Sequence, residues 1–345
     1  MTAIDFLYRG APFSGETMRR ASLGGIESSI VQLAEALAAR GHDVTVFNSI
    51  PAPAYEFGVQ WRPLAEASQR ARGEIGIAVA SPKAFDGTSF RTRIFWLHNP
   101  IRSWQQIRRG NVWPFMKTRP LFVLLGEYHK KHVPRWLPSS GRTIVHHGIQ
   151  EDFFRGEPLS EPPPPHALFT SQPYRGLDWL LDLWGEIKRQ VPAATFDVFA
   201  PKPHQAAANA AKSAAEGVSF RGSISRAGLV QELGTARVQL IPGHRDETYC
   251  LAAAEAIAAG VPVVTMGIGS LPERVRDGVN GFIARSKDEF IVRTVALLSD
   301  NGLWRAMHQQ CLSDPALSTW DERAKEWEAL FTRLEKFGSQ GRGKE

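Results

Sequence analysis

The chain has 345 residues, of which 43% are hydrophobic and 22% are charged, a composition typical of a globular protein. At about 100–200 residues per domain, this length predicts two domains. The net charge of +6 is too small for a protein that coats nucleic acid, and no apolar run reaches the ~20 residues of a membrane span. These properties exclude an integral membrane protein, a coiled coil and a secreted disulfide scaffold.

Only two cysteines occur, Cys250 and Cys311, which favours a reducing compartment. The first residues, MTAIDFLYRG, carry Asp5 and no basic leader, so we expect no signal peptide. The sequence therefore predicts a cytoplasmic protein, which would work on the cytoplasmic face of the membrane if its acceptor is a lipid.

The first half alternates strands and helices. A strand over 3–8 is followed by a loop rich in Gly and Arg, and then by a helix that ends at Gly41. Ile26, Ile30 and Leu37 recur at helical spacing on one face of that helix. The strands predicted after it cover residues 44–47, 75–79, 92–97, 121–125 and 142–145.

The second half repeats this rhythm. Its predicted strands cover 167–170, 195–200, 237–241 and 261–266, and its predicted helices cover 176–190, 204–216, 225–234 and 248–259. Alternation of this kind predicts parallel sheets covered on both faces, with ligands at the carboxyl ends of the strands.

A proline-rich stretch marks the expected boundary. GEPLSEPPPPHA contains five prolines and no apolar periodicity, which predicts a stiff linker. The expected division is a first domain over 1–157, a linker over 158–166, a second domain over 167–318, an amphipathic helix over 319–336 that returns to the first domain, and a disordered tail over 337–345.

Two segments have the chemistry of a donor site. Gly24 and Gly25 precede a helix, where small residues and the helix N-terminus suit a diphosphate, although an ordinary loop explains them equally well. Glu247 lies at a strand end, and Glu255 follows among small and apolar residues. A buried carboxylate requires hydrogen-bond donors, and the hydroxyls of ribose and sugar are suitable. A lone Glu of this kind is more often simply solvated.

The order of the motifs resembles the retaining GT-B glycosyltransferases of the sucrose synthase-like and phosphatidylinositol mannosyltransferase-like group. The signature of that group is two Glu separated by seven residues, here Glu247 and Glu255, followed by GVPVV. LPERVRDGVNGF, GGIESSIVQLAEALAARGHDVTV, HHGIQEDFF and the WD pair at 320–321 also match, in the family's order.

The resemblance implies an α/β chain with two Rossmann-like domains that face across a cleft. It implies transfer of a sugar, with retention of configuration, from a nucleotide sugar (UDP- or GDP-linked) to a glycan, lipid-linked or small-molecule acceptor, with no metal and no further cofactor. By position, Glu255 would bind the ribose and Glu247 the donor sugar, Gly24 and Gly25 would approach the diphosphate, and His98 would be the active-site histidine. The remaining donor-site positions would be Thr248, Tyr249, Cys250 and Leu251.

The phosphate contacts depart from the family pattern. Arg175 stands where Lys usually precedes Gly, and its guanidinium could clamp a diphosphate in place of a metal. The family's preceding Arg is absent, and Lys202 is a candidate for the second cation. Arg9, Arg19 and Arg20 in the loop before Gly24 could contact phosphate or acceptor, although surface charge explains them as well. His147 stands where Asn commonly precedes Gly148.

Residues 102–119 combine Arg and Lys with Trp104 and Trp113, which suits either an anionic membrane surface or an irregular protein surface. Nucleic-acid binding is disfavoured because the charge is dispersed and no recognition motif occurs. Three alternatives to the transferase remain open at this point. They are a nucleotide-sugar epimerase, a phosphorylase-like enzyme on the same scaffold, and a non-catalytic nucleotide-sugar-binding protein.

Overall fold

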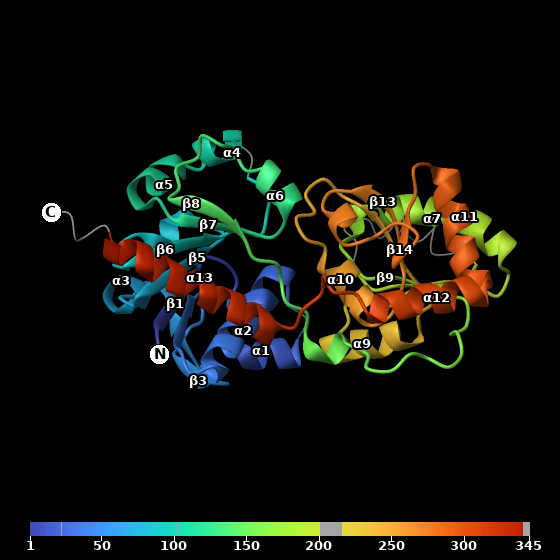
Figure 1. The fold of residues 1–345 in the computed structure, drawn as a ribbon, viewed down its shortest axis with the longest axis horizontal. Helices are drawn as coiled ribbons and strands as arrows, with labels where there is room; N and C mark the ends of the chain where they lie inside the picture. The colour runs from blue at the N-terminus through green and yellow to red at the C-terminus, as the bar shows by residue number, and fades with distance from the viewer. Residues whose placement is uncertain (22, 102, 201–215, 341–345) are drawn as a thin grey trace. The chain divides into compact units, whose positions relative to one another are not determined.

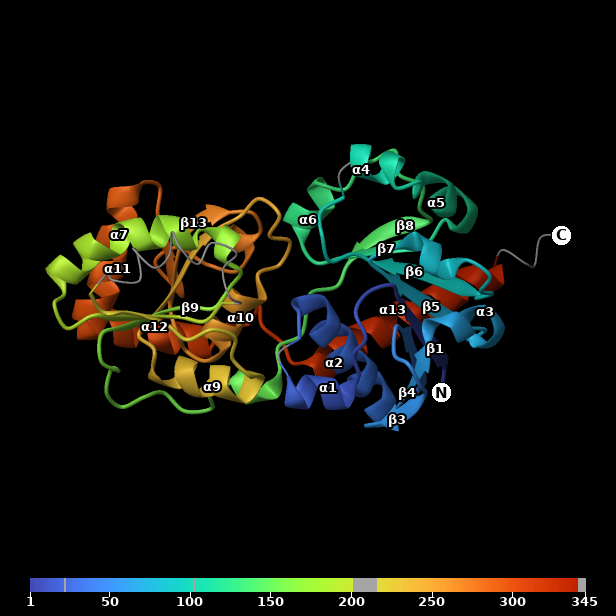
Figure 2. The same ribbon diagram turned by 180° about the vertical axis from the view of Figure 1, so that it is seen from behind.

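The structure is a computed structural model that describes residues 1–345 except 22, 102, 201–215 and 341–345, and except the side chains of 103, 104 and 337–340. It divides into two compact units, one made of Met1–Gly148 with Ser318–Glu345 and the other of Ile149–Leu317. Figures 1 and 2 show a sheet flanked by helices in each unit. The expected α/β class, with two Rossmann-like units of GT-B type, is confirmed.

The first unit is built on an eight-stranded sheet of order β3-β4-β2-β1-β5-β6-β7-β8. Its strands are β1 (Ala3–Tyr8), β2 (Asp43–Asn48), β3 (Ala54–Glu56), β4 (Val59–Pro63), β5 (Ile75–Val79), β6 (Thr92–Trp96), β7 (Leu121–Leu124) and β8 (Gly141–Ile144). All neighbours are parallel except the β3–β4 pair at the edge. The inner strands β1 and β5 are almost wholly buried and rich in Ile, Val and Phe, as expected for a sheet covered on both faces.

The helices of this unit are α1 (Gly15–Arg20), α2 (Gly25–Ala39), α3 (Ala67–Arg70), α4 (Ser103–Arg108), α5 (Val112–Thr118), α6 (Glu127–Lys131) and α13 (Trp320–Gln340). Short 3-10 turns η1 (Leu64–Glu66) and η2 (Pro82–Phe85) lie between them. The loop expected over 9–23 contains α1, because Ser14 and Thr17 close a capping box at its start. Sequence patterns that rely on long apolar stripes miss such a short helix.

The last helix, α13, belongs to the first unit and lies beside α2 in Figures 1 and 2. Arg40 pairs with Asp321 and Glu328 of α13, and Trp327 is fully buried against Trp96 of β6. The helix continues to Gln340, beyond the end expected at 336, and residues 341–345 lie outside the described part of the chain.

The second unit is built on a six-stranded parallel sheet of order β11-β10-β9-β12-β13-β14. Its strands are β9 (His166–Phe169), β10 (Thr195–Val198), β11 (Val218–Phe220), β12 (Val238–Gly243), β13 (Val263–Ile268) and β14 (Gly281–Ile283). Its helices are α7 (Leu177–Gln190), α9 (Arg226–Thr235), α10 (Leu251–Ala258), α11 (Lys287–Ser299) and α12 (Asn301–Leu312). The 3-10 turns are η3 (Glu151–Phe153), η4 (Pro173–Arg175) and η5 (Leu271–Glu273).

Figures 1 and 2 show α7 and α11 on one face of this sheet and α9 and α10 toward the other. The core under α7 is apolar, since Leu180, Trp184 and Ile187 recur at helical spacing and are buried. The helix expected over 204–216 lies almost wholly outside the described residues. The helix expected over 248–259 begins only at Leu251, so residues 248–250 form an irregular turn before it.

The proline-rich stretch 158–166 lies inside the second unit, because the division falls at Gly148. Its backbone is held there by side chains of that unit. Leu159 N–H donates to His308 Nε2 at 3.0 Å, and Arg237 donates to the Pro163 carbonyl at 3.3 Å. Proline stiffness is a sound reason to expect an extended segment, but stiffness alone does not show whether a segment packs against its neighbours.

Candidate functional site

The carboxyl ends of β9 and β12 bring together two of the predicted donor-site residues. Arg175 closes the turn η4 after β9, and Glu247 lies in the loop after β12. Arg175 Nη1 donates to Glu247 Oε2 at 2.5 Å, and the Glu247 side chain is only 6% exposed. The predicted clamp for the diphosphate and the predicted ligand of the sugar therefore form one ion pair.

Local geometry holds this pair in place. Gly176 has φ of +108°, and a Cβ there would lie 2.8 Å from Pro242 Cβ, so only glycine allows η4 to approach β12 this closely. Gly269 approaches the backbone of Glu247 in the same way, since a Cβ at this glycine would lie 3.0 Å from the Glu247 carbonyl oxygen. Ser270 N–H donates to that carbonyl at 3.0 Å. The loop after β13 thus fixes the loop after β12.

Burial and charge act in opposite directions on Glu247. Burial raises the pKa of its carboxyl, while Arg175, the Cys250 backbone N–H and His244 lower it. Burial is the larger effect, so the pKa of Glu247 lies above its ordinary value. Burial also lowers the pKa of Arg175, but Glu247, Tyr174 and Cys250 together raise it by more and keep it above its ordinary value. Arg175 therefore opposes the neutralisation of Glu247 that burial favours.

Glu255 forms an ion pair with a different arginine, Arg226, which the sequence analysis did not identify. Glu255 is buried on α10, and Arg226, the first residue of α9, donates from Nη2 to its Oε1 at 2.7 Å. The Arg226 guanidinium also lies 4.6 Å from the ring centroid of Phe153. Nothing near Arg226 in the sequence marks it, because the contact joins two helices 29 residues apart.

The turn between these acids is tightly packed. Thr248, Tyr249 and Cys250 are buried, and Cys250 has φ of 64°, the left-handed region that non-glycine residues rarely adopt. Burial raises the pKa of the Cys250 thiol well above its usual value, so the side chain is an inert thiol. Leu251 begins α10, so the four residues predicted for the donor site form the entry to the helix that carries Glu255.

His98 lies in the first unit, two residues after the end of β6. It is buried against Trp96 and His147, with ring centroids 4.3 and 5.0 Å away. Burial, together with the nearby His129, lowers the pKa of His98 to about 3. A histidine in this position is neutral at physiological pH and would act on a ligand through hydrogen bonds rather than through charge.

Gly24 and Gly25 lie at the start of α2, with Gly24 as the N-cap. Glu27 of the first turn lies over Gly24, where a Cβ would come within 2.5 Å of its Oε2, and it accepts a hydrogen bond from Tyr8. A diphosphate that approaches Gly24 would therefore meet this carboxylate first. Lys202 and Arg102, and the side chain of Trp104, lie outside the described part of the structure.

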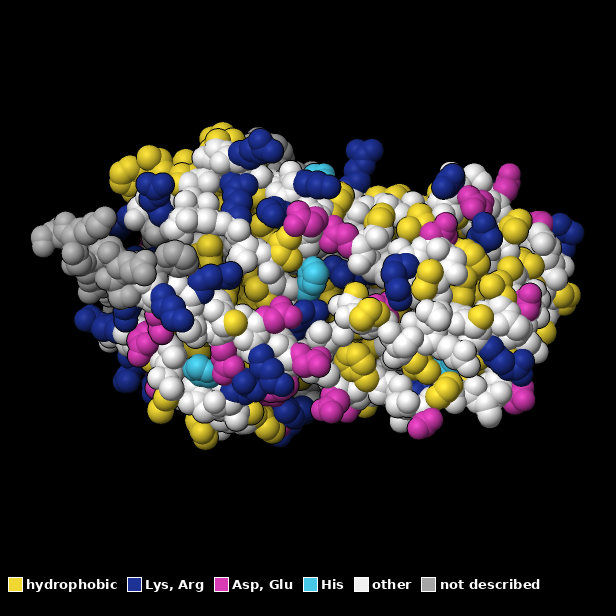
Figure 3. Space-filling model, in the orientation of Figure 1, with side chains coloured by type: hydrophobic (Ala, Val, Ile, Leu, Met, Phe, Trp, Pro, Cys, Tyr) yellow, Lys and Arg dark blue, Asp and Glu magenta, His cyan; other side chains and the backbone are white. Residues whose placement is uncertain are grey.

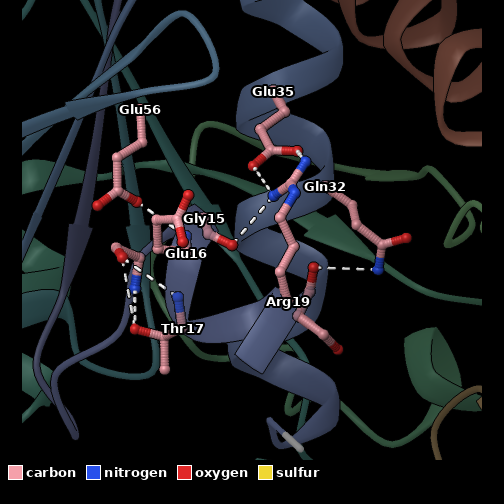
Figure 4. Close-up of polar contacts among 9 residues, drawn as sticks. Gly15, Glu16, Thr17, Arg19, Gln32, Glu35 and Glu56 are labelled. Carbon is pink, nitrogen blue, oxygen red and sulfur yellow. Dashed lines mark hydrogen bonds and ion pairs between the residues drawn. The ribbon is translucent and has the colours of Figure 1, made fainter. Parts of the chain in front are cut away.

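The arginines before Gly24 are engaged in local contacts. Figure 4 shows Arg19 of α1 reaching Glu35 of α2, with Nη1–Oε1 and Nη2–Oε2 distances of 2.9 and 3.1 Å. Arg19 also lies 3.4 Å over the Phe57 ring, and Arg20 pairs with Glu16. Arg19 thus secures α1 against α2 and the β3–β4 hairpin, whereas the ion pair of Arg20 lies within α1. Both contacts agree with the simpler explanation of these residues as surface charge.

Within the described residues, no group of three or more His, Cys, Asp or Glu side chains is arranged to hold a metal ion. In the same part of the chain, no helix has both the length and the apolar character needed to cross a bilayer.

Comparison with known proteins agrees with this architecture. Residues 164–300 match the family described as Glycosyl transferases group 1. Sucrose-phosphate synthase from Thermosynechococcus elongatus superposes with a TM-score of 0.75 at 15% identity, covering 97% of this chain and all (100%) of that one. HepE of Anabaena, in complex with UDP and glucose, superposes with a TM-score of 0.72 at 15% identity, covering 96% and 99%.

Curated relatives match shorter stretches. D-inositol 3-phosphate glycosyltransferase of Mycolicibacterium gilvum is 42% identical over 74 residues, which are 21% of this chain and 16% of that protein. The enzyme of the same name from Streptomyces avermitilis is 30% identical over 126 residues, 34% of this chain and 26% of that protein. The matched stretch thus spans only about a sixth to a quarter of these relatives.

The two sheets and their helices have the GT-B fold. The match to the group 1 glycosyltransferases covers residues 164–300 of the second unit, and this stretch carries Glu247 and Glu255.

Proposed function

We propose that this protein transfers a sugar from a nucleotide-sugar donor to a glycan, lipid-linked or small-molecule acceptor, with retention of configuration and without an obligatory metal. The observation that carries the proposal is the pairing of two buried acids with two arginines in the second unit, Glu247 with Arg175 and Glu255 with Arg226. HepE of Anabaena binds UDP and glucose on the same fold, which supports a nucleotide-sugar donor here.

The residues have distinct roles in this proposal. Glu255 accepts hydrogen bonds from the ribose hydroxyls, and Glu247 accepts them from the donor sugar. Arg175 then turns from Glu247 toward the diphosphate, where its planar guanidinium neutralises the charge of the leaving group. His98, kept neutral by burial, hydrogen-bonds the donor sugar as positive charge develops at its anomeric carbon.

The first test is a thermal-shift panel with UDP, GDP, ADP and dTDP and their common sugars, with and without EDTA. A nucleotide that binds only the folded protein raises its melting temperature. We expect one nucleotide class to do so equally in EDTA. NMR of the product should then show the anomeric configuration of the donor. If the protein binds a nucleotide sugar but releases no free nucleotide with any acceptor tested, the result would instead favour a non-catalytic binding protein.

A lipid-linked acceptor would place the first unit at a membrane. The surface of the first unit supports such a contact. Figure 3 shows hydrophobic side chains over α4 and α5 with Lys and Arg beside them. The apolar members are Ile107, Trp113 and Met116, which are 64%, 71% and 52% exposed. The exposed cations around them are Arg108, Arg109, Lys117 and Arg119. This combination suits an anionic lipid surface.

Sedimentation with vesicles tests the contact. The variant Trp113→Ser/Met116→Ser should lose binding to vesicles that contain phosphatidylglycerol and should keep its nucleotide-induced thermal shift. Tyr55→Ser is the matched control, because Tyr55 is 74% exposed at the other edge of the same sheet. Equal vesicle binding by all three proteins would contradict this part of the proposal.

A further inference from the structure

A cavity of about 470 Å³ lies in the first unit, and none of the residues assigned to the donor lines it. It is formed by α6, by the turn after it and by the edge strand β8. The residues that line it are Glu127, Lys130, Lys131, Val133, Arg135 and Arg142. Four of these six side chains are cations and one is an acid, so the cavity has an excess of positive charge.

Arg142 lies in this cavity without an acid to balance it. Its guanidinium donates from Nη1 to the Val133 carbonyl at 3.0 Å and from Nη2 to the Pro134 carbonyl at 2.6 Å. No carboxylate of the described residues lies within ion-pair distance of it. Burial, together with the positive charge of Arg135, lowers the pKa of Arg142. The carbonyls therefore fix the position of the cation but leave its charge uncompensated.

The other cations of the cavity also outnumber the acids that could neutralise them. The one acid of the cavity, Glu127, lies 3.4 Å from Lys130. Lys131 and Arg135 are exposed, and neither pairs with an acid in the described part of the chain. In Figure 3, several Lys and Arg side chains lie around the position that α6 occupies in Figure 1, with Asp and Glu side chains beside them. Like charges held this close repel one another, and a bound anion would relieve the repulsion.

We propose that this cavity is a binding site for a phosphate ester. Arginine binds phosphate through two parallel N–H donors, and lysine adds a point charge, so the set of Lys131, Arg135 and Arg142 matches a tetrahedral dianion. A volume of about 470 Å³ exceeds the size of a bare phosphate and is within the usual range for small-molecule sites. The ligand is therefore a phosphate attached to a polyol or sugar. The site does not depend on the proposed transferase activity.

Calorimetry tests the proposal without a donor or an acceptor assay. Glycerol 3-phosphate is titrated into the full chain at constant ionic strength, with glycerol as the uncharged comparison. The variant Lys131→Ala/Arg135→Ala should bind glycerol 3-phosphate at least about tenfold more weakly, since each charge-assisted hydrogen bond contributes about 1.5–3 kcal/mol. Both substituted residues are exposed, so the variant should fold normally.

Arg72→Ala is the matched control, because Arg72 is an exposed arginine of the same unit outside the cavity. It should bind glycerol 3-phosphate like the unmodified chain. Equal affinity in the double variant, or no binding by the unmodified chain at millimolar ligand, would overturn the proposal. Either result leaves the nucleotide-sugar test unaffected, because that test reads the second unit.

The phosphate ester could belong to a free metabolite or to a lipid headgroup. Vesicles that contain phosphatidic acid distinguish these sources when they compete with glycerol 3-phosphate. If the headgroup is the natural ligand, the vesicles displace glycerol 3-phosphate, and the double variant binds them less than Arg72→Ala does. If the ligand is a free metabolite, the vesicles leave its affinity unchanged. Both results support the site. If the double variant binds the vesicles as well as the native chain does, the natural ligand is a free metabolite.

Discussion

Arg175 and Glu247 meet at 2.5 Å, although they come from loops that follow different strands of the second sheet. The family resemblance assigned them separate tasks, one at the diphosphate and the other at the sugar. If Arg175 binds the diphosphate as proposed, it must give up at least part of its contact with Glu247. In that case the pair would hold the carboxylate in position until the sugar hydroxyls replace the guanidinium.

Arg175→Met leaves Glu247 buried without a cation, so we expect it to lower both stability and turnover. Removing one member of a buried pair costs about 3 kcal/mol of unfolding free energy. Glu247→Gln keeps the shape of the side chain and should cost less stability, yet it should also lower turnover. A double-mutant cycle over urea unfolding and over kcat measures the coupling. Strict additivity in stability would show that the pair does not exist in solution.

Glu255→Ala should weaken the binding of the nucleoside diphosphate about 10- to 100-fold, because it removes a charged hydrogen-bond acceptor from the ribose. Arg226→Met should weaken binding as well, since it leaves Glu255 buried without the guanidinium that orients it. Calorimetry with the nucleotide found in the thermal-shift panel measures both effects. Arg221→Met, a partly exposed arginine just upstream of α9, is the control. Full affinity in Glu255→Ala would remove the ribose role from this residue.

His98→Ala should lower kcat about 100-fold, which is the usual effect of removing one hydrogen-bonding group near a developing charge. Nucleotide affinity should change little. Because burial lowers the pKa of His98 to about 3, this residue should add no limb to the pH–rate profile between pH 5 and 8. Kinetics across that range check both statements. An acidic limb near pH 6.5 that disappears in His98→Gln would show that the histidine titrates and that its burial is wrong.

The sequence predicted the sheets and both acids of the second unit for different reasons. Apolar runs and helical stripes, such as Leu180 with Trp184, report burial directly. Glu247 and Glu255 were found through a fixed spacing along one segment. Arg226 was missed because its role arises only when α9 packs near α10. The boundary at Gly148 was missed for a similar reason, since the prolines of 158–166 do not reveal that the segment packs against His308 and Arg237.

His129 connects two loops of the first unit and gives a prediction about acid stability. Leu125 N–H donates to its Nδ1 at 3.4 Å, and its Nε2 faces the Asn99 carbonyl at 3.2 Å, next to His98. Burial lowers the pKa of His129 to about 4 from an ordinary 6.5. Between these values the unfolded chain binds a proton that the folded chain does not, so stability falls as pH decreases from 6.5 to 4. The loss from His129 is about 2 kcal/mol at pH 5.

Urea unfolding of the native chain and of His129→Gln, at several pH values from 4.5 to 7.5, measures this loss. The variant should be less stable at neutral pH, because glutamine fits the two contacts less well, but its stability should decline less steeply in acid. Asp5 changes the pH dependence of stability in the opposite direction, since burial raises its pKa to about 6. This contribution cancels in the comparison because both proteins contain Asp5. Lys130→Gln is the control, because Lys130 is exposed on the same short helix, and it should leave the slope unchanged. Parallel slopes for the native chain and His129→Gln would mean that His129 has the same pKa in the folded and the unfolded chain.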